Sequence, residues 1–234
     1  MKTTLAALAV CAAAGMAQAD VIAYWAFPEP TQSPNYTIAW PVASDLGSGT
    51  LDTDAPKYDG TPSPNALSQG SMQFFAGSAV NAQPGFAAGQ ALSLRNDTLD
   101  RGQGKSIFLT IDAGNYKDLV LSYAERFTST GPQQVEVRYS ADGVNFTSFT
   151  TYATNRSGAF EPNARVIDLS TVSGIEFNSA VILAITFNQF NANSSGAARL
   201  DNITVEGTFV PAPGSLALLG LGGLASFRGA RRRR

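Results

Sequence analysis

Few side chains in this sequence could perform nucleophilic or zinc chemistry. The 234 residues contain no histidine and a single cysteine, Cys11. Ser-His-Asp triads, Cys-His pairs and His-ligated zinc are therefore excluded from the chain. Among the 18 acidic residues, no pair stands in a motif that separates an acid from a nucleophile. We therefore expect no catalytic residue, and a glycosidase that works with two carboxylates alone is the lesser alternative.

Aromatic side chains are the second group that could have a function, because exposed rings can bind carbohydrate by stacking on the faces of sugars. The less regular N-terminal half contains Trp25, Trp40, Tyr58, Phe74 and Phe75. Trp40, which precedes Pro41, is the exposed ring best suited to bind a carbohydrate. Trp25 lies in the alternating run VIAYWAF, which favours packing in the core instead. Trp40 is therefore the ligand-binding residue that we predict.

The charge in the middle of the chain argues against nucleic acid as a ligand. Residues 20–209 carry 10 basic and 18 acidic side chains, a net charge of 10 − 18 = −8. A nucleic-acid-binding domain needs a positive face. The same stretch is long enough for one sizeable domain with its own core. We therefore expect a single acidic domain.

The hydrophobic pattern that must position these residues has a period of two. Apolar and polar side chains alternate over 134–140, as in a half-buried strand. The apolar run 181–187 (VILAITF) is typical of a central strand covered on both faces. Further strands are expected at 21–27, 106–111, 119–123, 165–169 and 199–206. Residues 28–65 are rich in Pro, Ser, Asp and Gly, which indicates long loops with short strands.

Helix signals are almost absent between the two ends of the chain. Short strands separated by Gly, Pro, Asn and Asp indicate two packed antiparallel sheets. We therefore predict an all-β fold, an antiparallel jelly-roll-like β-sandwich over residues 20–209. An N-terminal signal-peptide helix and a short C-terminal membrane helix are expected to flank it.

One turn signal marks a hairpin within this domain. Asp142-Gly143 separates the strand 134–140 from the Thr-rich and aromatic stretch 146–152, and an Asp-Gly pair tolerates positive φ. The run VEVRYSADGVNF resembles a hairpin of discoidin-like and galactose-binding-like jelly rolls. The run RLDNITV, residues 199–205, resembles their closing strand. This resemblance covers residues 105–209 and implies the jelly-roll fold.

The same resemblance implies a structural Ca²⁺. Jelly-roll sugar-binding modules often hold such an ion between their first and last strands, on six to eight oxygen ligands. Asp201 stands where the closing-strand ligand would be, and Glu29 follows the first predicted strand. The alternative is that Asp201 accepts hydrogen bonds from loop amides without a metal. No other cofactor is expected.

The N-terminus has the three parts of a secretory signal peptide. Lys2 supplies the positive start, residues 5–14 form a small apolar stretch, and Ala17-Gln18-Ala19 is a small-x-small cleavage site. Signal peptidase is therefore an expected partner. It would remove residues 1–19 and leave a mature chain that begins near Asp20.

Residues 210–234 carry a second targeting signal. Pro211-Ala212-Pro213 is a stiff spacer ahead of an uncharged apolar stretch, 216–227. The leucines that suit a membrane are Leu216, Leu218, Leu219, Leu221 and Leu224. The chain then ends with Arg231, Arg232, Arg233 and Arg234. An arginine cluster cannot cross a membrane and is attracted to anionic cytoplasmic lipid, so we expect an anchor with its C-terminus inside.

This tail resembles the PEP-CTERM sorting tail of exopolysaccharide-producing Gram-negative and related bacteria. Ala212 stands where the family motif has Glu, as in a Pro-Ala-Pro variant. The resemblance covers residues 210–234 and implies cleavage near the proline motif by an exosortase-type protease, so that the helix is a temporary tether. The alternative is an ordinary C-terminal membrane anchor.

Together these features predict a non-enzymatic exported protein. It would be tethered transiently to the inner membrane and then delivered to the cell surface or the exopolysaccharide matrix. The expected partners are signal peptidase, the exosortase-type protease, the membrane and an extracellular polysaccharide. The alternative is a carbohydrate-binding adhesin that is anchored by its C-terminal helix and uses loop aromatics and calcium.

Overall fold

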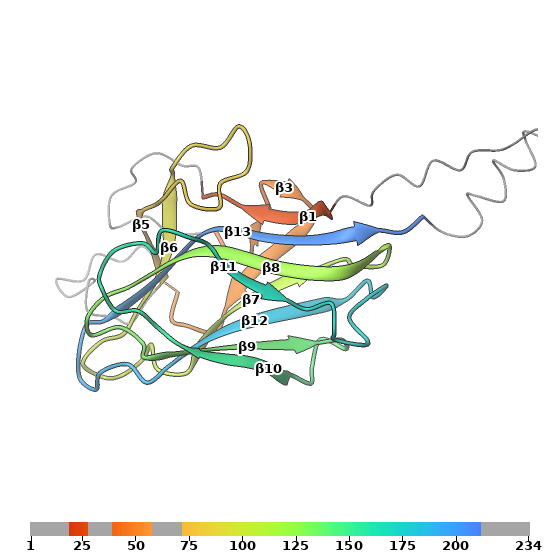
Figure 1. Ribbon diagram of the computed structural model, residues 1–234. Helices are drawn as coiled ribbons and strands as arrows, with labels where there is room; N and C mark the ends of the chain where they lie inside the picture. The colour runs from red at the N-terminus through yellow and green to blue at the C-terminus, as the bar shows by residue number, and fades with distance from the viewer. Residues whose placement is uncertain (1–18, 28–38, 58–71, 212–234) are drawn as a thin grey trace, which may run out of the picture.

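The computed structural model describes residues 19–27, 39–57 and 72–211, which form two antiparallel sheets packed as a β-sandwich. Figure 1 shows the two layers, with β13 and β8 in one and β12 and β9 in the other. Sheet A contains β1 (Ala19–Trp25), β3 (Leu46–Gly47), β5 (Met72–Ala76), β6 (Gln90–Arg95), β8 (Tyr116–Phe127), β11 (Arg165–Asp168) and β13 (Ala197–Phe209). Sheet B contains β2 (Val42–Ala43), β4 (Gly49–Thr53), β7 (Lys105–Ile111), β9 (Gln134–Ser140), β10 (Thr147–Ala153) and β12 (Val181–Asn188).

Strand β13 is the centre of sheet A. Along one side it pairs with β8. Along the other side it pairs first with β6, over residues 197–200, and then with β1, over residues 203–208. A bulge between Asp201 and Thr204 marks the change of partner. Two distant parts of the chain thus share one edge of β13, and the register places Ala19 beside Thr208.

The inward side chains of both sheets form one apolar core. In sheet B, Ile107, Ile185 and Val137 are consecutive cross-strand neighbours and are all buried. In sheet A, Leu121 on β8 stands opposite Val205 on β13. Burying a side chain of this size stabilises the fold by roughly 1.5–3 kcal/mol. Trp25 is fully buried, which confirms its predicted place in the core.

Each segment predicted as a strand is one. The expected strand 134–140 coincides with β9, and 181–187 lies within β12, which is central in sheet B. In the region expected to be loops with short strands, the described part contains the short strands β2, β3 and β4. The residues that the structure describes contain no helix.

Strands β5 and β6 were not predicted, because two adjacent phenylalanines hide the alternation of β5. Phe74 packs against the core, whereas Phe75 points to the other side of the strand and is 41% exposed. Both rings therefore lie on a strand of sheet A within the less regular N-terminal half.

The hairpin at Asp142-Gly143 is confirmed, but its connection is longer than a two-residue turn. Residues 141–146 join β9 to β10, and Gly143 has a φ of +76°. The Asp142 carboxylate accepts hydrogen bonds from the backbone N–H groups of Val144 (2.9 Å) and Asn145 (2.8 Å). The hydrogen bonds from Asn145 hold the pKa of Asp142 well below its usual range. A side chain therefore shapes the turn.

Most of the predicted targeting residues lie outside the described residues. These are Ala17, Ala212, Pro213, the leucines Leu216, Leu218, Leu219, Leu221 and Leu224, and Arg231 to Arg234. Of the remainder, Ala19 begins β1 and Pro211 follows β13. Within 19–27, 39–57 and 72–211, no helix is long and apolar enough to cross a membrane.

Candidate functional site

An aromatic and cationic surface crosses the outer face of sheet B. Leu109 and Val137 face the core, so their strand neighbours Phe108 and Arg138 project outward. The register of β7, β12 and β9 places Ala184 between these two outward side chains. A small residue thus separates a ring from a guanidinium.

Phe146, from the connection between β9 and β10, fills this space. Its ring centroid is 5.7 Å from that of Phe108, and the Cζ of Arg138 is 5.4 Å from the Phe146 centroid. Ala184 is fully buried although it points away from the core, which the covering ring explains. We name Phe108, Phe146 and Arg138 the sheet B platform.

Hydroxyl groups hold Arg138 in place. Its Nη2 donates hydrogen bonds to Ser106 Oγ (3.1 Å) and Thr186 Oγ1 (2.9 Å). These two hydroxyls also hydrogen-bond to each other at 2.9 Å. Arg138 makes no ion pair with any residue that the structure describes. Its charge is therefore fixed in position but not neutralised.

Trp40 lies at the β2 edge of the same sheet. The Nζ of Lys57 is 5.3 Å from the Trp40 ring centroid and 2.6 Å from Asp52 Oδ1. Asp52 in turn is the cross-strand neighbour of Phe108. Trp40 is half-buried against the core, and its Nε1 is buried without a hydrogen-bond partner among the described residues. The ring predicted to bind a ligand therefore lies near the platform, with Lys57 and Asp52 between them.

Asp201 is fully buried under the loop that connects β5 to β6. Its Oδ2 accepts a hydrogen bond from the backbone N–H of Ser78 (2.6 Å), and its Oδ1 accepts one from that of Asn202 (2.8 Å). A Cβ at Gly77 would stand 2.4 Å from Oδ2, so the loop approaches as only glycine permits. Burial raises the pKa of Asp201 to about 7.

Only one of the two predicted Ca²⁺ ligands, Asp201, belongs to the described residues. The described residues supply the Asp201 carboxylate, whose two oxygens accept hydrogen bonds from the backbone N–H groups of Ser78 and Asn202. The other expected ligand, Glu29, lies outside them, and no group of three metal-binding side chains occurs within them. A structural Ca²⁺ here stays a prediction.

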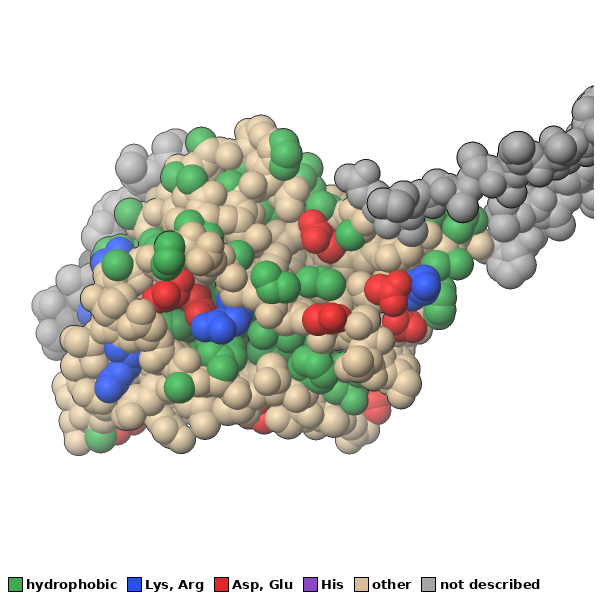
Figure 2. Space-filling model, viewed as in Figure 1, with side chains coloured by type: hydrophobic (Ala, Val, Ile, Leu, Met, Phe, Trp, Pro, Cys, Tyr) green, Lys and Arg blue, Asp and Glu red, His purple; other side chains and the backbone are tan. Residues whose placement is uncertain are grey.

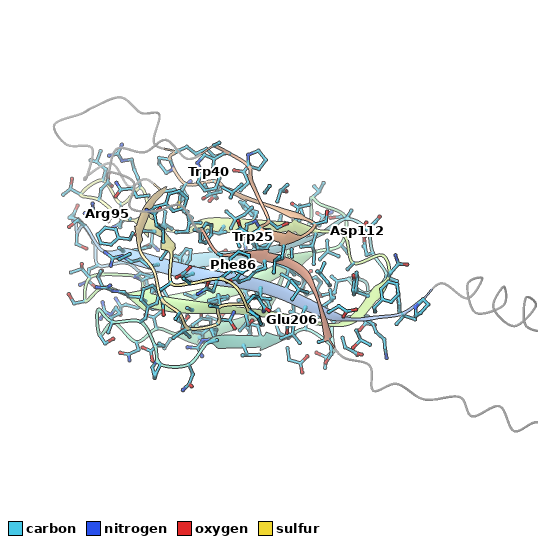
Figure 3. All side chains as sticks on the ribbon, turned by 90° about the horizontal axis from the view of Figure 1, so that it is seen from above. Trp25, Trp40, Phe86, Arg95, Asp112 and Glu206 are labelled. Carbon is cyan, nitrogen blue, oxygen red and sulfur yellow. The ribbon has the colours of Figure 1, made fainter. Side chains whose placement is uncertain are left out.

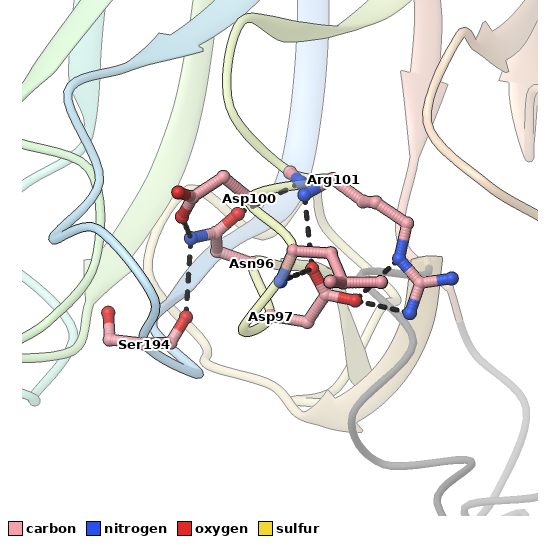
Figure 4. A network of polar contacts seen from close by, with 7 residues as sticks. Asn96, Asp97, Asp100, Arg101 and Ser194 are labelled. Carbon is pink, nitrogen blue, oxygen red and sulfur yellow. Dashed lines mark hydrogen bonds and ion pairs between the residues drawn. The ribbon is translucent and has the colours of Figure 1, made fainter.

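Two carboxylates that lie close together in the β6–β7 loop hold that loop in shape. Asn96 Nδ2 donates to Asp100 Oδ1 (2.9 Å) and to the carbonyl oxygen of Ser194 (3.2 Å), as Figure 4 shows. Asp97 is ion-paired with Arg101. Burial alone would raise the pKa of Asp97, but the hydrogen bonds from Arg101 bring it below the usual value. Asp97 therefore shapes its own loop, whereas Asn96 and Asp100, which also accepts a hydrogen bond from the Asn193 N–H (3.0 Å), tie this loop to residues 193–194.

A buried polar cluster joins the β8–β11 side of sheet A to β10 of sheet B. Glu125 Oε1 accepts hydrogen bonds from Arg165 Nε (3.0 Å) and Nη2 (2.6 Å), and Oε2 accepts one from the Tyr152 hydroxyl (2.7 Å). The Tyr152 hydroxyl also lies 2.8 Å from that of Tyr123. Figure 2 shows apolar side chains in several patches on one face of the molecule, with acidic and basic side chains near them. The cluster therefore links the two sheets by hydrogen bonds, and we name it the clasp between the sheets.

Comparison with known proteins yields likenesses in structure only. No protein-family model matches the chain, and no curated protein matches its sequence. The carbohydrate-binding module TmCBM61, solved with β-1,4-galactotriose, is 9% identical over 66% of this chain and 86% of its own, with a TM-score of 0.39. The xylan-binding module CBM15 is 10% identical over 73% and 97%, with a TM-score of 0.42. CpGH89CBM32-5 from Clostridium perfringens, in complex with GalNAc-β-1,3-galactose, is 15% identical over 67% and 94%, with a TM-score of 0.35. Similarity at this level assigns neither a ligand nor an activity to this chain.

The sequence did not identify the sheet B platform. Phe108 and Arg138 both stand in the polar phase of an alternating strand, where their solvent exposure could be expected. Phe108, an aromatic residue at an outward position of a strand, was the one feature of the sequence that could have indicated a binding surface. The contact with Phe146 depends on the register of three strands, which alternation alone does not give.

Proposed function

We propose that this domain binds a polysaccharide through the outer face of sheet B. The observation that carries the proposal is the sheet B platform on the outer side of a sheet. It consists of two adjoining rings and a guanidinium that has no carboxylate partner in the part of the chain that the structure describes. The apolar C–H faces of a sugar can pack on Phe108 and Phe146, while Arg138 donates hydrogen bonds to sugar oxygens.

The shape of this surface favours a chain of sugars over a single one. The strand order β9-β12-β7-β4-β2 gives four strand spacings between Arg138 and the Trp40 edge, roughly 19 Å. A polysaccharide that lies across the strands would contact Arg138 and Phe146, then Phe108, then Asp52 and Trp40. The predicted ring at Trp40 would form the far end of this binding surface.

The proposed role is binding without catalysis. Glycosidases place two carboxylates about 5–10 Å apart on either side of the bond that they cleave. Asp52 on β4 and Glu136 on β9 both point to the outer face of sheet B, but they lie three strand spacings apart, roughly 14 Å. Asp52 is also paired with Lys57. Asp52 and Glu136 therefore do not have the spacing of a glycosidase pair.

Affinity gel electrophoresis tests the binding proposal. The gels contain the exopolysaccharide extracted from the native host, or a neutral polysaccharide such as xylan or β-1,4-galactan. We expect at least one of them to retard the protein and Phe108→Ala to abolish that retardation. Phe209→Ala is the matched control, because Phe209 is 45% exposed on sheet A, away from the platform. Equal retardation of Phe108→Ala and the unaltered protein would contradict the proposal.

We also propose that the protein is exported and then sorted by an exosortase-type protease. The support is the leader at residues 1–19 and the tail at residues 210–234. The pairing of Ala19 with Thr208 attaches both segments at one end of sheet A. Cleavage after Ala19 would leave residues 20–25 of β1 paired with β13. Neither cleavage therefore requires the sandwich to open.

Intact mass and cell fractionation of the protein from its native host test this sorting proposal. The expected species is extracellular, begins near Asp20 and ends near Pro211 to Pro213. A membrane-bound species that begins near Asp20 and keeps Arg234 would contradict sorting. It would support the alternative of a module held by an ordinary C-terminal anchor.

A further inference from the structure

Buried polar atoms without partners are concentrated in one row of sheet A. Ser93 on β6, Arg199 on β13 and Arg126 on β8 are consecutive cross-strand neighbours. In the described part of the molecule, six buried side-chain nitrogen or oxygen atoms have no hydrogen-bond partner. Four of them belong to this row, namely Ser93 Oγ, Arg199 Nε, Arg199 Nη1 and Arg126 Nε. Native proteins leave few such atoms unsatisfied, so their concentration in one place calls for an explanation.

The same row is part of an uncompensated positive cluster. Arg95 lies on β6 two residues beyond Ser93, opposite Ala197 of β13. None of Arg95, Arg126 and Arg199 forms an ion pair with a residue that the structure describes. Like charges directly opposite each other on adjacent strands destabilise a sheet. The protein therefore keeps an arrangement that costs stability.

Burial makes this arrangement more unfavourable for Arg199. Its side chain is one of the buried charged groups, with 7% of the residue exposed. Burial and then the charges of Arg126 and Arg95 lower the pKa of Arg199 to about 10. A nearby anion would relieve both effects.

Two aromatic rings fix the orientation of the guanidinium groups. The Cζ of Arg199 lies 3.5 Å from the centroid of the Phe75 ring, and that of Arg126 lies 5.9 Å from the centroid of Phe160. Stacking covers a face of a guanidinium and leaves its N–H edge for an acceptor. Arg95 and Arg126 are only half-buried, so the cluster reaches solvent. Figure 3 places Arg95 at the end of the sandwich away from Asp112.

The residue before Arg126 on β8 shows how this protein satisfies an arginine when the role is structural. Glu125 faces the opposite side of the strand from Arg126 and accepts two hydrogen bonds from Arg165. Among the described residues, Arg126 and Arg199 have no equivalent carboxylate. The difference sets these two arginines apart from the structural arginine Arg165.

We propose that Arg95, Arg126 and Arg199 bind an oxyanion, a carboxylate or a sulfate, carried by an acidic polysaccharide. Guanidinium groups match both oxyanions with paired N–H donors. The exposed Phe75 ring beside them offers a surface for the attached sugar. The inference rests on the proposed polysaccharide binding, but it uses the outer face of sheet A, opposite the sheet B platform.

Affinity gels that contain polygalacturonate, dextran sulfate or neutral dextran test this site on the mature protein. We expect retardation by at least one charged polymer, which falls as salt rises. Polygalacturonate and dextran sulfate then distinguish a carboxylate from a sulfate. Arg126→Gln should weaken the binding about tenfold or more, the equivalent of ~1.4 kcal/mol. Arg156→Gln is the control, because Arg156 is bonded to Asn191 (3.0 Å) outside the cluster.

The outcomes separate this site from the sheet B platform. Loss of binding to charged polymers in Arg126→Gln, with unchanged binding of a neutral polysaccharide, supports the proposal. Equal affinity of Arg126→Gln, Arg156→Gln and the unaltered protein for the charged polymers overturns it. If those affinities are equal but Phe108→Ala still loses binding to a neutral polysaccharide, the proposed function stands and only the inference about the arginine cluster fails.

A second variant distinguishes a ligand site from a structural arginine. Arg199→Met removes buried donors that have no partner among the described residues, so its Tm should equal or exceed that of the unaltered protein. Its affinity for the charged polymer should fall. A lower Tm with unchanged affinity would overturn the proposal, because that result is expected of an arginine that only supports the fold.

Discussion

Arg138 lies with its Cζ 5.4 Å from the centre of the Phe146 ring, although the two residues come from different sides of a turn. The contact pins the β9–β10 connection onto the outer face of sheet B, where Phe146 also contacts Phe108. The turn that Asp142 shapes therefore has a second consequence. It delivers an aromatic ring to the outer face of sheet B, between Phe108 on β7 and Arg138 on β9.

Phe146→Ala should weaken polysaccharide binding about tenfold, because one ring of the stack is lost, the equivalent of ~1.4 kcal/mol. Isothermal titration against the polysaccharide that retards the unaltered protein measures the change. Val144→Ala is the matched control, since Val144 belongs to the same connection and is 76% exposed. A similar loss of affinity in both variants would show that the connection matters and that the ring does not.

Glu125→Ala should lower the free energy of unfolding by about 3 kcal/mol, because it leaves the Arg165 guanidinium without its buried partner. Urea unfolding followed by fluorescence measures this loss. The control is Glu206→Ala on β13, an acid without an ion pair among the described residues, for which the change should stay within about 0.5 kcal/mol. Equal stability of the two variants would mean that the clasp between the sheets contributes nothing.

Asp201 should make the protein less stable as pH rises from about 4 to 7. Burial raises its pKa to about 7 in the folded protein, whereas an aspartate of the unfolded chain titrates near 3.9. The folded state therefore binds more protons in this interval, and the contribution is complete below pH 4 and lost above 7. Its full size is about 4 kcal/mol at most.

Urea unfolding of the unaltered protein and of Asp201→Asn, at several pH values without calcium, isolates this contribution. The difference in unfolding free energy between the two should change steadily across the interval. A difference that is constant from pH 4 to 7 contradicts the raised pKa.

If Asp201 and Glu29 bind calcium, the ion should offset the loss of stability that the ionised Asp201 causes near pH 7. An ion that binds only the folded state raises the Tm, and it should do so more at pH 7.5 than at pH 5, where Asp201 is protonated. Thermal unfolding with and without CaCl₂ measures the shift, and Asp201→Asn should abolish it. An unmoved Tm in the unaltered protein would remove the calcium hypothesis.

The sequence predicted the strands of the core well, because alternation reports which face of a strand is buried. Segment 134–140 is β9 to the residue, and the apolar run of β12 is central in sheet B. Strand β12 was predicted to be covered on both faces, and it is. On its outer face, the covering side chains are those of Arg138 and Phe146.

The candidate sites could not be predicted in the same way. Phe108 and Phe146 are distant in sequence and meet only because β7, β12 and β9 adopt one register. Arg126 and Arg199 likewise become neighbours through the pairing of β8 with β13. Hydrophobic periodicity gives the face of each residue but not its cross-strand partner.

Hydroxyl-radical footprinting of the intact protein, with and without the polysaccharide that retards it, tests the binding proposal most directly. Oxidation of Phe108 and Phe146 should fall when the polysaccharide is added, while that of Phe209 should not change. If Phe108 and Phe146 react equally in both samples and protection appears elsewhere, the outer face of sheet B is not the binding surface.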